Sequence, residues 1–268
     1  MMVKLSPLVR GTFRYEFVMV ARRRSLWLAT VPLLGLVVIG QLTSGGSVAG
    51  GASGRIVNLM TAATLLMVPG IAVLLADVVV RVRRLHLVDL LESCPADRRA
   101  RVAGTVLGSL AMAVSPTVIA ILVFAAVEAV RAGDAWLVAR AVGAVACVLL
   151  PSVVVMVAIG AVAAVYLPIA VARAGVVGLW FWASAWNSSL IPLPSPTGTL
   201  LSPYTAYVNV GWFGAPTGWA GRGAPELLSP APTAWTALLS LALIIVVAVA
   251  MLYLAARAMD PVRASSRS

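Results

Sequence analysis

Long hydrophobic runs separated by short polar links make up most of the chain. A helix needs about 20 consecutive apolar residues to cross a hydrocarbon core of about 30 Å, and six runs come near that length. The pattern therefore predicts an all-α integral membrane protein with six transmembrane helices, at residues 26–42, 56–80, 102–127, 138–167, 175–191 and 234–256. Prolines inside the first four of these helices predict kinks at residues 32, 69, 116 and 151.

The segment before the first predicted span, residues 1–25, has the periodicity of an amphipathic helix. Leucine, valine and phenylalanine recur at helical spacing on one face, while arginines occupy another face and close the segment. A helix of this kind lies in the plane of the lipid headgroups. A plain charged tail is the alternative, and the regular apolar stripe argues against it. A cleaved signal peptide, suggested by the small residues at 47–49, would have a shorter and simpler charged region.

The longest charged passage, residues 77–101, separates the second and third predicted spans. Its middle carries one apolar helical stripe with members at i, i+3, i+4 and i+7: Leu87, Leu90, Leu91 and Cys94. Pro95 would end that helix, and Asp97 is placed to cap the next one. The pattern favours a short amphipathic helix from 85 to 94 that sits in a groove of a soluble partner. A helix resting on the membrane surface is the alternative.

The longest link, residues 187–234, precedes the last predicted span and contains eight of the 16 prolines. A structureless connection of that length would be unusual in a compact protein. Its tyrosines and tryptophans suit a segment folded back into the outer membrane interface, where these side chains are favoured. We expect a compact, re-entrant extracellular cap with a short helix near residues 200–213. A merely solvated loop is the alternative.

Composition supports the membrane interpretation. Hydrophobic residues make up 61% of the 268 residues and charged residues only 11%, with a mean hydropathy of +1.01, whereas soluble domains carry about a quarter charged residues. We therefore expect one transmembrane domain over residues 1–268. The net charge of +11 does not indicate nucleic-acid binding, because the basic residues lie in short links beside apolar spans rather than on one soluble face.

The basic residues predict the orientation of the chain. With the N-terminus inside, 16 of the 20 Lys and Arg residues fall in the inner segments and four fall in the outer links. This distribution follows the positive-inside rule, so both termini are expected in the cytoplasm. Both termini on one side require an even number of spans, and six satisfies that requirement.

The chain lacks the residues that nucleotide binding, metal binding and ion-coupled transport require. Lys4 is the only lysine, so there is no phosphate-binding loop of the G-x-x-x-x-G-K-[ST] type. His86 is the only histidine, and the two cysteines, Cys94 and Cys147, stand in no metal-ligand spacing and cannot form a disulfide framework. The span interiors are almost uncharged, unlike those of ion-coupled transporters. Energy for transport would therefore arrive mechanically, from a partner that acts on the charged loop.

The layout and one short motif carry a family resemblance. Residues 90–95, Leu-Leu-Glu-Ser-Cys-Pro, are similar to the Leu-Leu-x-x-x-Pro pattern in the loop after span two of the ABC-2 type permeases. These permeases are the membrane subunits of bacterial ABC exporters. The in-plane N-terminal helix, the six spans and the large outer link before span six resemble the same family in layout, over essentially the whole chain.

The resemblance implies a homodimeric permease of the bacterial cytoplasmic membrane that binds two copies of a separate ABC ATPase. ATP and Mg would bind to that ATPase, and this chain would hold no cofactor or metal and have no enzymatic activity of its own. Closure of the ATPase would be transmitted through a coupling helix between spans two and three. Carried onto this sequence, the coupling residues are Leu85, Leu87, Asp89, Leu90, Leu91, Glu92, Cys94 and Pro95.

The same resemblance implies a translocation path lined by spans two and five at the dimer interface. In this chain the candidate residues are Asn58, Thr61, Leu65, Phe181, Trp182, Trp186 and Asn187. An aromatic wall with few hydrogen-bonding groups suits an amphipathic cargo, such as a drug, an antibiotic or a lipid, that is moved outward. The alternative is that the tryptophans anchor the membrane interface and that the Asn and Thr side chains serve helix packing.

Two other functions stay open. The chain could be a membrane anchor that recruits a partner through the charged loop without transport, or an enzyme that modifies lipids. The lack of a histidine outside the loop and of metal-ligand clusters argues against the enzyme. Membrane lipids are expected neighbours in each case, and no nucleic acid is expected.

Overall fold

The structure is a computed structural model that describes residues 7–43, 50–78, 98–186, 194–216, 220–221, 223 and 226–258. Every regular element in these residues is helical. The α-helices are α1 (Pro7–Ala21), α2 (Arg24–Thr43), α3 (Gly51–Leu75), α6 (Arg98–Ala132), α7 (Trp136–Ala144), α8 (Leu150–Tyr166), α9 (Ile169–Ser184), α10 (Ala206–Phe213) and α11 (Ala234–Ala258). A π-helix, η1 (Val145–Leu149), joins α7 to α8, and a 3₁₀ helix, η2 (Glu226–Leu228), precedes α11.

Four helical units are long and apolar enough to cross a membrane: α3, α6, α11 and the continuous unit α7–η1–α8. The helices α1 and α2 meet at 69° and give a fifth candidate if the bent pair counts as one span. Helix α9 is also apolar, but its 16 residues rise only about 24 Å, less than a hydrocarbon core of about 30 Å. The described part of the chain is therefore an all-helical, multi-pass membrane protein with four to five candidate spans.

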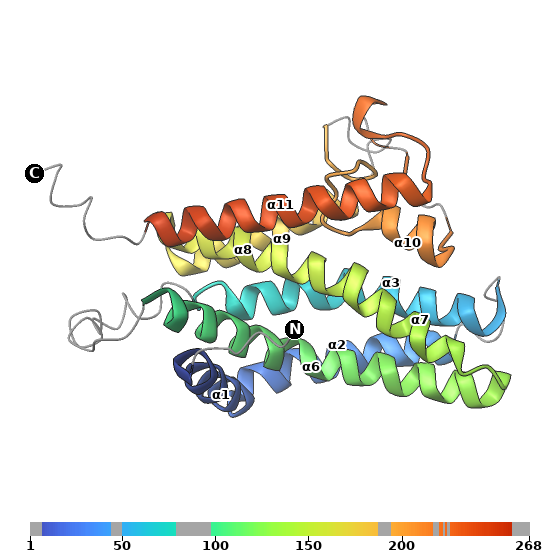
Figure 1. The fold of residues 1–268 in the computed structure, drawn as a ribbon, viewed down its shortest axis with the longest axis horizontal. Coiled ribbons are helices and arrows are strands. Elements are labelled where there is room, and N and C mark those ends of the chain that lie inside the picture. The colour runs from blue at the N-terminus through green and yellow to red at the C-terminus, as the bar shows by residue number, and fades with distance from the viewer. Residues whose placement is uncertain are drawn as a thin grey trace, which may run out of the picture.

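Helix α3 lies at the centre of the bundle. It packs against α2 and α6 and also against α8 and α9, and Figure 1 shows these two groups on opposite sides of it. In the most apolar stretch of α3, 61% of the residues are buried, whereas in that of α11 only 22% are buried. Helix α11 therefore lies at the periphery of the bundle. The largest side chains that are fully buried in these elements include Met60, Met67, Ile71, Leu149 and Met156.

The fourth predicted span changes helix type at η1, directly before Pro151. A proline lacks the N–H that would continue the helical hydrogen-bond ladder, and π-turns accompany such irregularities. Ser152, which is buried, donates to the carbonyl of Val148 at 2.8 Å and so gives one acceptor of the irregular turn a partner. The irregularity predicted at Pro151 thus takes the form of one π-turn inside a continuous unit of 31 residues.

The two ends of the bundle differ in what they hold. Figure 1 shows the end of α3, the beginning of α6 and the end of α11 together with α1, and we call this the α1 end. The beginning of α3, the turn from α6 to α7 and α10 lie at the opposite end, which we call the cap end. Helix α10 falls inside residues 200–213, where the sequence predicts a short helix, and it packs against α11, α7 and η1.

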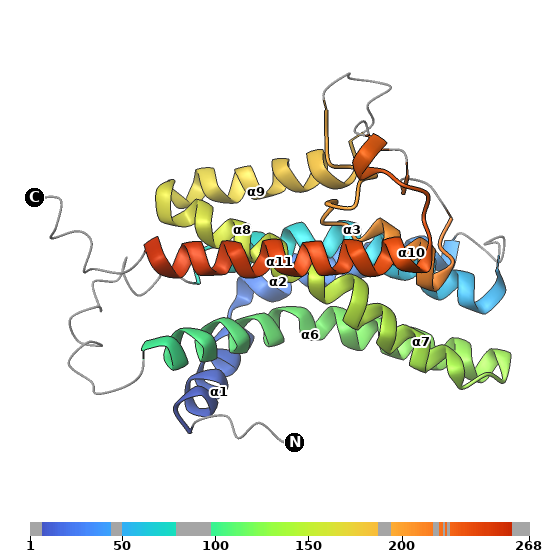
Figure 2. The ribbon, with the colours of Figure 1, turned by 45° about the horizontal axis from the view of Figure 1, so that its top comes forward.

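Helix α1 confirms a helix within residues 1–25, and it crosses α6 at two glycines (Figure 2). A methyl group on Gly104 would lie 2.9 Å from the carbonyl oxygen of Val9, and one on Gly108 would lie 2.5 Å from that of Phe13. Small residues four apart allow such close approach between membrane helices. Val9 and Val20 are buried and Phe13 and Phe17 are half-buried, so protein covers much of the described part of the predicted apolar stripe.

At the cap end, two helices extend beyond the predicted spans. Helix α3 begins at Gly51 and α6 ends at Ala132, so Arg55 and Glu128 lie inside helices rather than in links. These two side chains pair with each other across α3 and α6. The pairing offsets part of the cost of removing each charge from water, and that is why the helices can continue through charged residues.

Candidate functional site

The eight predicted coupling residues between 85 and 95 lie outside the described residues, and so does Asn187 of the predicted path. The chain is described up to Val78, after α3, and again from Arg98, where α6 begins. Both points lie at the α1 end of the bundle (Figure 1). The charged loop is therefore attached to the two helices that contact each other next to α1.

The three predicted path residues on α3 all take part in packing. The side-chain amide of Asn58 donates to the side-chain oxygen of Gln41 on α2 at 3.1 Å. Thr61 forms a side-chain hydrogen bond with Tyr204, a residue of the segment between α9 and α11. Burial raises the pKa of the Tyr204 phenol, and the bond to Thr61 acts in the opposite direction. These polar side chains thus link α3 to α2 and to the cap end.

Trp180, on α9, also contacts α3. Its side chain is fully buried, and its indole N–H donates to the carbonyl oxygen of Leu65 at 2.9 Å. Its ring meets that of Tyr204 edge-on, with the ring centroids 6.4 Å apart. A buried indole N–H needs an acceptor, and here the acceptor is the main chain of the neighbouring helix. Trp180 therefore fixes α9 against both α3 and the cap end.

The predicted aromatic wall lies elsewhere on α9. Phe181 and Trp182 are 44% and 37% exposed, and Trp186 is half-buried in the segment after the helix. The backbone N–H of Trp186 donates to the hydroxyl of Thr197 at 3.2 Å, and that hydroxyl donates to the carbonyl of Trp182 at 3.0 Å. The structure therefore brings Leu65 together with Trp180 and leaves Phe181 and Trp182 on the surface of α9.

Sequence reasoning missed Trp180 because it followed the one-turn spacing of Trp182 and Trp186. The signal that could have found it is the spacing of four from Ala172 to Val176 to Trp180. All three side chains are buried, and they form the packing face of α9. When small residues and one large aromatic residue recur every four positions, they lie on one face of a helix. This spacing indicates a packing face more directly than a cluster of aromatic residues does.

Hydroxyl groups attach the segment between α9 and α11 to the spanning helices. A buried polar side chain needs a hydrogen-bond partner. Two hydroxyls of this segment, and one of α11 that faces it, donate to carbonyl oxygens far away in sequence. Because two of the three bonds reach α9 or α11, the segment is held at the cap end rather than free in solvent. The bonds are Ser202 to Ala183 at 3.0 Å, Ser240 to Leu200 at 2.9 Å and Tyr207 to Pro230 at 2.8 Å.

Thr205 precedes α10 with a backbone φ of 53°, a left-handed conformation that a β-branched residue rarely adopts. Its side chain is fully buried and donates to the carbonyl of Tyr204 at 2.7 Å. The hydroxyls of Thr205 and Ser152 lie 3.4 Å apart, beside the π-turn of the fourth span. Strained backbone of this kind persists only where the surroundings hold it, and here they are α8 and η1.

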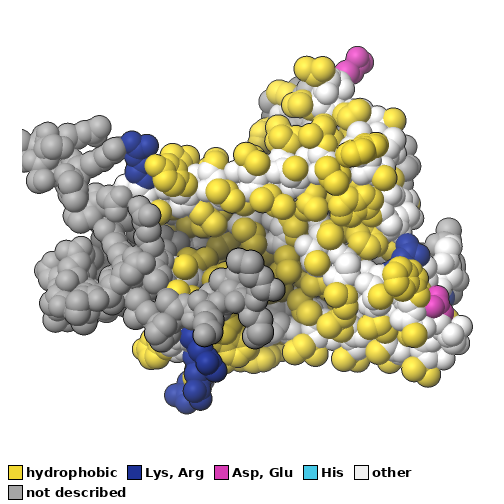
Figure 3. All heavy atoms as spheres, in the orientation of Figure 1, with side chains coloured by type: hydrophobic (Ala, Val, Ile, Leu, Met, Phe, Trp, Pro, Cys, Tyr) yellow, Lys and Arg dark blue, Asp and Glu magenta, His cyan; other side chains and the backbone are white. Residues whose placement is uncertain are grey.

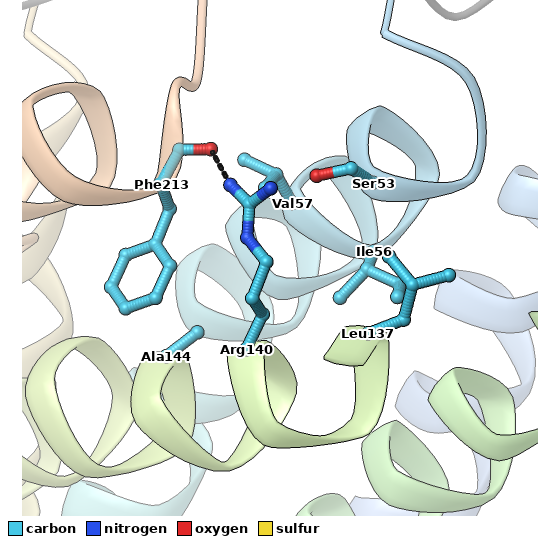
Figure 4. A pocket seen from close by; sticks show the side chains of 7 residues that line it. All are labelled: Ser53, Ile56, Val57, Leu137, Arg140, Ala144 and Phe213. Carbon is cyan, nitrogen blue, oxygen red and sulfur yellow. Dashed lines mark hydrogen bonds between the residues drawn. The ribbon is translucent and has the colours of Figure 1, made fainter. Parts of the chain in front are cut away.

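A small cavity lies between α3, α7 and α10 at the cap end (Figure 4). Its volume is about 10 Å³, which is room for about one water molecule. The guanidinium of Arg140 points into it and donates to the carbonyl of Phe213 at 3.1 Å, and the hydroxyl of Ser53 faces the same space. The cavity can hold a small polar group, and it is too small for an amphipathic cargo.

A buried ion pair joins α3 to α6 at the cap end. Glu128 is only 2% exposed, and its carboxylate accepts two hydrogen bonds from Arg55, one of them from Nε at 3.0 Å. Arg131 lies 3.4 Å from the other carboxylate oxygen. A second, looser pair, Arg173 and Asp77, has its charged atoms 3.9 Å apart at the α1 end.

The described arrangement consists of packing contacts, hydrogen bonds and ion pairs. Among the described residues, no group of three His, Cys, Asp or Glu side chains gathers where it could hold a metal ion. Comparisons with known protein families and with curated proteins find no match for this chain. The site is thus defined by its own geometry: a packed contact at Trp180, a hydrogen-bonded cap end and an exposed aromatic surface on α9.

Replacement of Trp180 by phenylalanine is expected to lower the free energy of unfolding by about 1–2 kcal/mol, because the bond to Leu65 and part of the ring volume are lost. Unfolding in mixed detergent micelles, followed by fluorescence, would measure the change. The matched control is Trp182→Phe on the exposed surface of the same helix, expected to change stability by less than about 0.5 kcal/mol. Equal effects of the two variants would show that Trp180 does not carry this contact.

Proposed function

We propose that the chain is the membrane-spanning subunit of an ATP-driven exporter of the ABC-2 type. In this proposal a separate ATPase hydrolyses ATP with Mg, and this chain moves an amphipathic substrate outward. The observation that carries the proposal is α6, a single helix of 35 residues whose first turn is the end of the charged passage. At 1.5 Å per residue it extends about 52 Å, from the α1 end to the cap end. A push on the loop would therefore reach the opposite end through one continuous helix.

The placement of charge supports a mechanical source of energy. The paired side chains Arg55, Glu128 and Arg131 lie at the cap end, and Asp77 and Arg173 lie at the α1 end. Ion-coupled transporters place ionisable side chains near the middle of the membrane, where the ion binds. In the described helices the charged residues stand towards the ends, as expected for a permease driven by a partner.

The proposed topology counts α2 as a span and also α9, whose short apolar length would be met by local thinning of the bilayer. These two make six spans with α3, α6, α7–η1–α8 and α11. The α1 end is then cytoplasmic, with both termini and the charged loop, and the cap end is extracellular. The excess of arginine in the segments at the α1 end supports this orientation in a bacterial cytoplasmic membrane. It also presents the predicted coupling helix to an ATPase in the cytoplasm.

The proposed substrate path and dimer interface use the exposed aromatic surface of α9. Phe181 and Trp182 offer apolar area outside the packed contact of Trp180. Such a surface suits a large apolar or amphipathic molecule, or a second copy of this chain around it. In this proposal Asn58 and Thr61 position α3 behind the path through their hydrogen bonds to α2 and the cap end.

The test of the proposal is ATPase coupling. We expect the chain to co-purify with an ABC ATPase encoded beside it, and to lose that ATPase when Leu87, Leu90 and Leu91 are all replaced by aspartate. The matched control is His86→Asp, on another face of the same predicted helix, and it should leave binding unchanged. Binding without cargo movement in vesicles, over several classes of amphipathic substrate, would favour a recruitment anchor instead. Full ATPase binding by the triple variant would overturn the coupling role.

A further inference from the structure

Helix α1 has two faces with different neighbours. One face carries Thr12 and Glu16 and packs on α6, where the Ser109 hydroxyl donates to the Glu16 carboxylate at 3.4 Å. The other face is exposed and includes Arg10, Arg14 and Tyr15, and Tyr15 is 66% exposed. The packing on α6 thus uses the apolar stripe and the only acidic residue of the helix, and leaves a basic surface outside.

The basic surface continues past the corner between α1 and α2. Arg22 and Arg24 are exposed there, so this part of the chain presents four exposed arginines, with Arg23 half-buried between the last two. Glu16 is the only acidic residue in 7–43, and it lies on the opposite side of α1. We call Arg10, Arg14, Arg22 and Arg24 the α1 arginines. Figure 3 shows Lys and Arg side chains projecting where α1 lies, with hydrophobic surface next to them.

The corner between α1 and α2 carries side chains that favour the membrane interface. Trp27, at the end of the first turn of α2, is 43% exposed, and its indole N–H donates to the carbonyl of Ala21 at 2.8 Å. Tryptophan and tyrosine with one apolar side and one hydrogen-bonded side favour the headgroup region. Helix α1 turns away from α2 by 69° at this corner. In a membrane crossed by α2, Tyr15 and the α1 arginines would therefore lie closer to the plane of the interface than to its normal.

We propose that the α1 arginines form a binding surface for the phosphate headgroups of anionic phospholipids. An amphipathic helix ordinarily holds the membrane through its apolar face, but α6 already covers that face here. What remains is electrostatic: Arg10 and Arg14 are four residues apart, close enough for both guanidinium groups to contact one phosphate. Clusters of four or more basic residues beside a spanning helix have this preference for anionic lipids. The proposal does not depend on the transport function proposed above.

The proposal is tested on the purified full-length chain in detergent, with phosphatidylglycerol and phosphatidylcholine added separately and binding followed by native mass spectrometry. We expect phosphatidylglycerol to bind more tightly, and each arginine removed from the surface to weaken that preference about fivefold. The double variant Arg10→Gln/Arg14→Gln should therefore lose about 25-fold, and Arg10→Lys/Arg14→Lys should lose less. The matched control is Arg257→Gln, an exposed arginine of α11 at the same end of the bundle.

Two further measurements distinguish a site for lipid headgroups from a site for free phosphate and from apolar lipid adsorption. Raising the salt from about 0.1 M to about 1 M shortens the Debye length from about 10 Å to about 3 Å, and should weaken binding of phosphatidylglycerol by the unaltered chain. Inorganic phosphate at millimolar concentration should not displace the lipid. Equal binding of the two lipids, displacement by inorganic phosphate, or full binding by the double glutamine variant with unchanged thermal unfolding would each overturn the proposal.

Discussion

Replacement of Arg55 by alanine is expected to lower the free energy of unfolding by about 3–5 kcal/mol, because it leaves a carboxylate buried without its main partner. Glu128 is only 2% exposed, and Arg55 gives it two of its hydrogen bonds. The remaining neighbour, Arg131, has a side chain that is 67% exposed and lies 3.4 Å away. A largely solvated arginine compensates a buried carboxylate only weakly.

The order of the variants is a sharper test than any single value. Glu128→Ala should cost less than Arg55→Ala, because the stranded Arg55 side chain is 30% exposed and can extend towards water. The double variant Arg55→Ala/Glu128→Gln should be more stable than Arg55→Ala alone, since it removes the buried charge itself. Arg131→Ala is the control and should change stability by less than about 1 kcal/mol. If Arg131→Ala matched Arg55→Ala, the assignment of the pair would be wrong.

The helical, multi-pass character of the chain was predictable because it depends on the length of apolar runs, which any stretch of sequence displays by itself. The predicted runs at 56–80, 102–127, 138–167 and 234–256 coincide with the four helical units that can cross a membrane. Their ends were less predictable where charges pair. In the sequence, Arg55 and Glu128 each belong to a polar link. They are 73 positions apart in the chain, and only their contact in the fold explains why both lie within helices.

The partner of an apolar face was not predictable from periodicity. The stripe on residues 1–25 correctly indicated a helix, but periodicity reports that one face is covered and not what covers it. The same limit applies to α9, where three aromatic residues follow one another and only the fold distinguishes buried Trp180 from exposed Phe181 and Trp182. The coupling residues between 85 and 95 lie outside the described residues and stay a prediction.

Replacement of Gly108 by alanine is expected to displace α1 from α6 and to lower the free energy of unfolding by about 1–3 kcal/mol. The added methyl carbon would lie 2.5 Å from the carbonyl oxygen of Phe13 and 3.1 Å from its Cα, both of which are backbone atoms that no rotamer change can move. In an uncrowded helix the same replacement would instead raise helix propensity by up to about 1 kcal/mol. The sign of the effect therefore reports the contact between the two helices.

The matched control for this prediction is Gly178→Ala, at a helical glycine whose added methyl group would meet nothing within 4 Å. It should be neutral or slightly stabilising. Displacement of α1 is measured separately, by the reaction of a cysteine at position 9 with a soluble maleimide after Cys94 and Cys147 are replaced by serine. Val9 is 9% exposed, so the cysteine should react slowly in the parent and quickly beside Gly108→Ala. Slow reaction in both, with Gly108→Ala as stable as Gly178→Ala, would mean that α1 does not dock through Gly108.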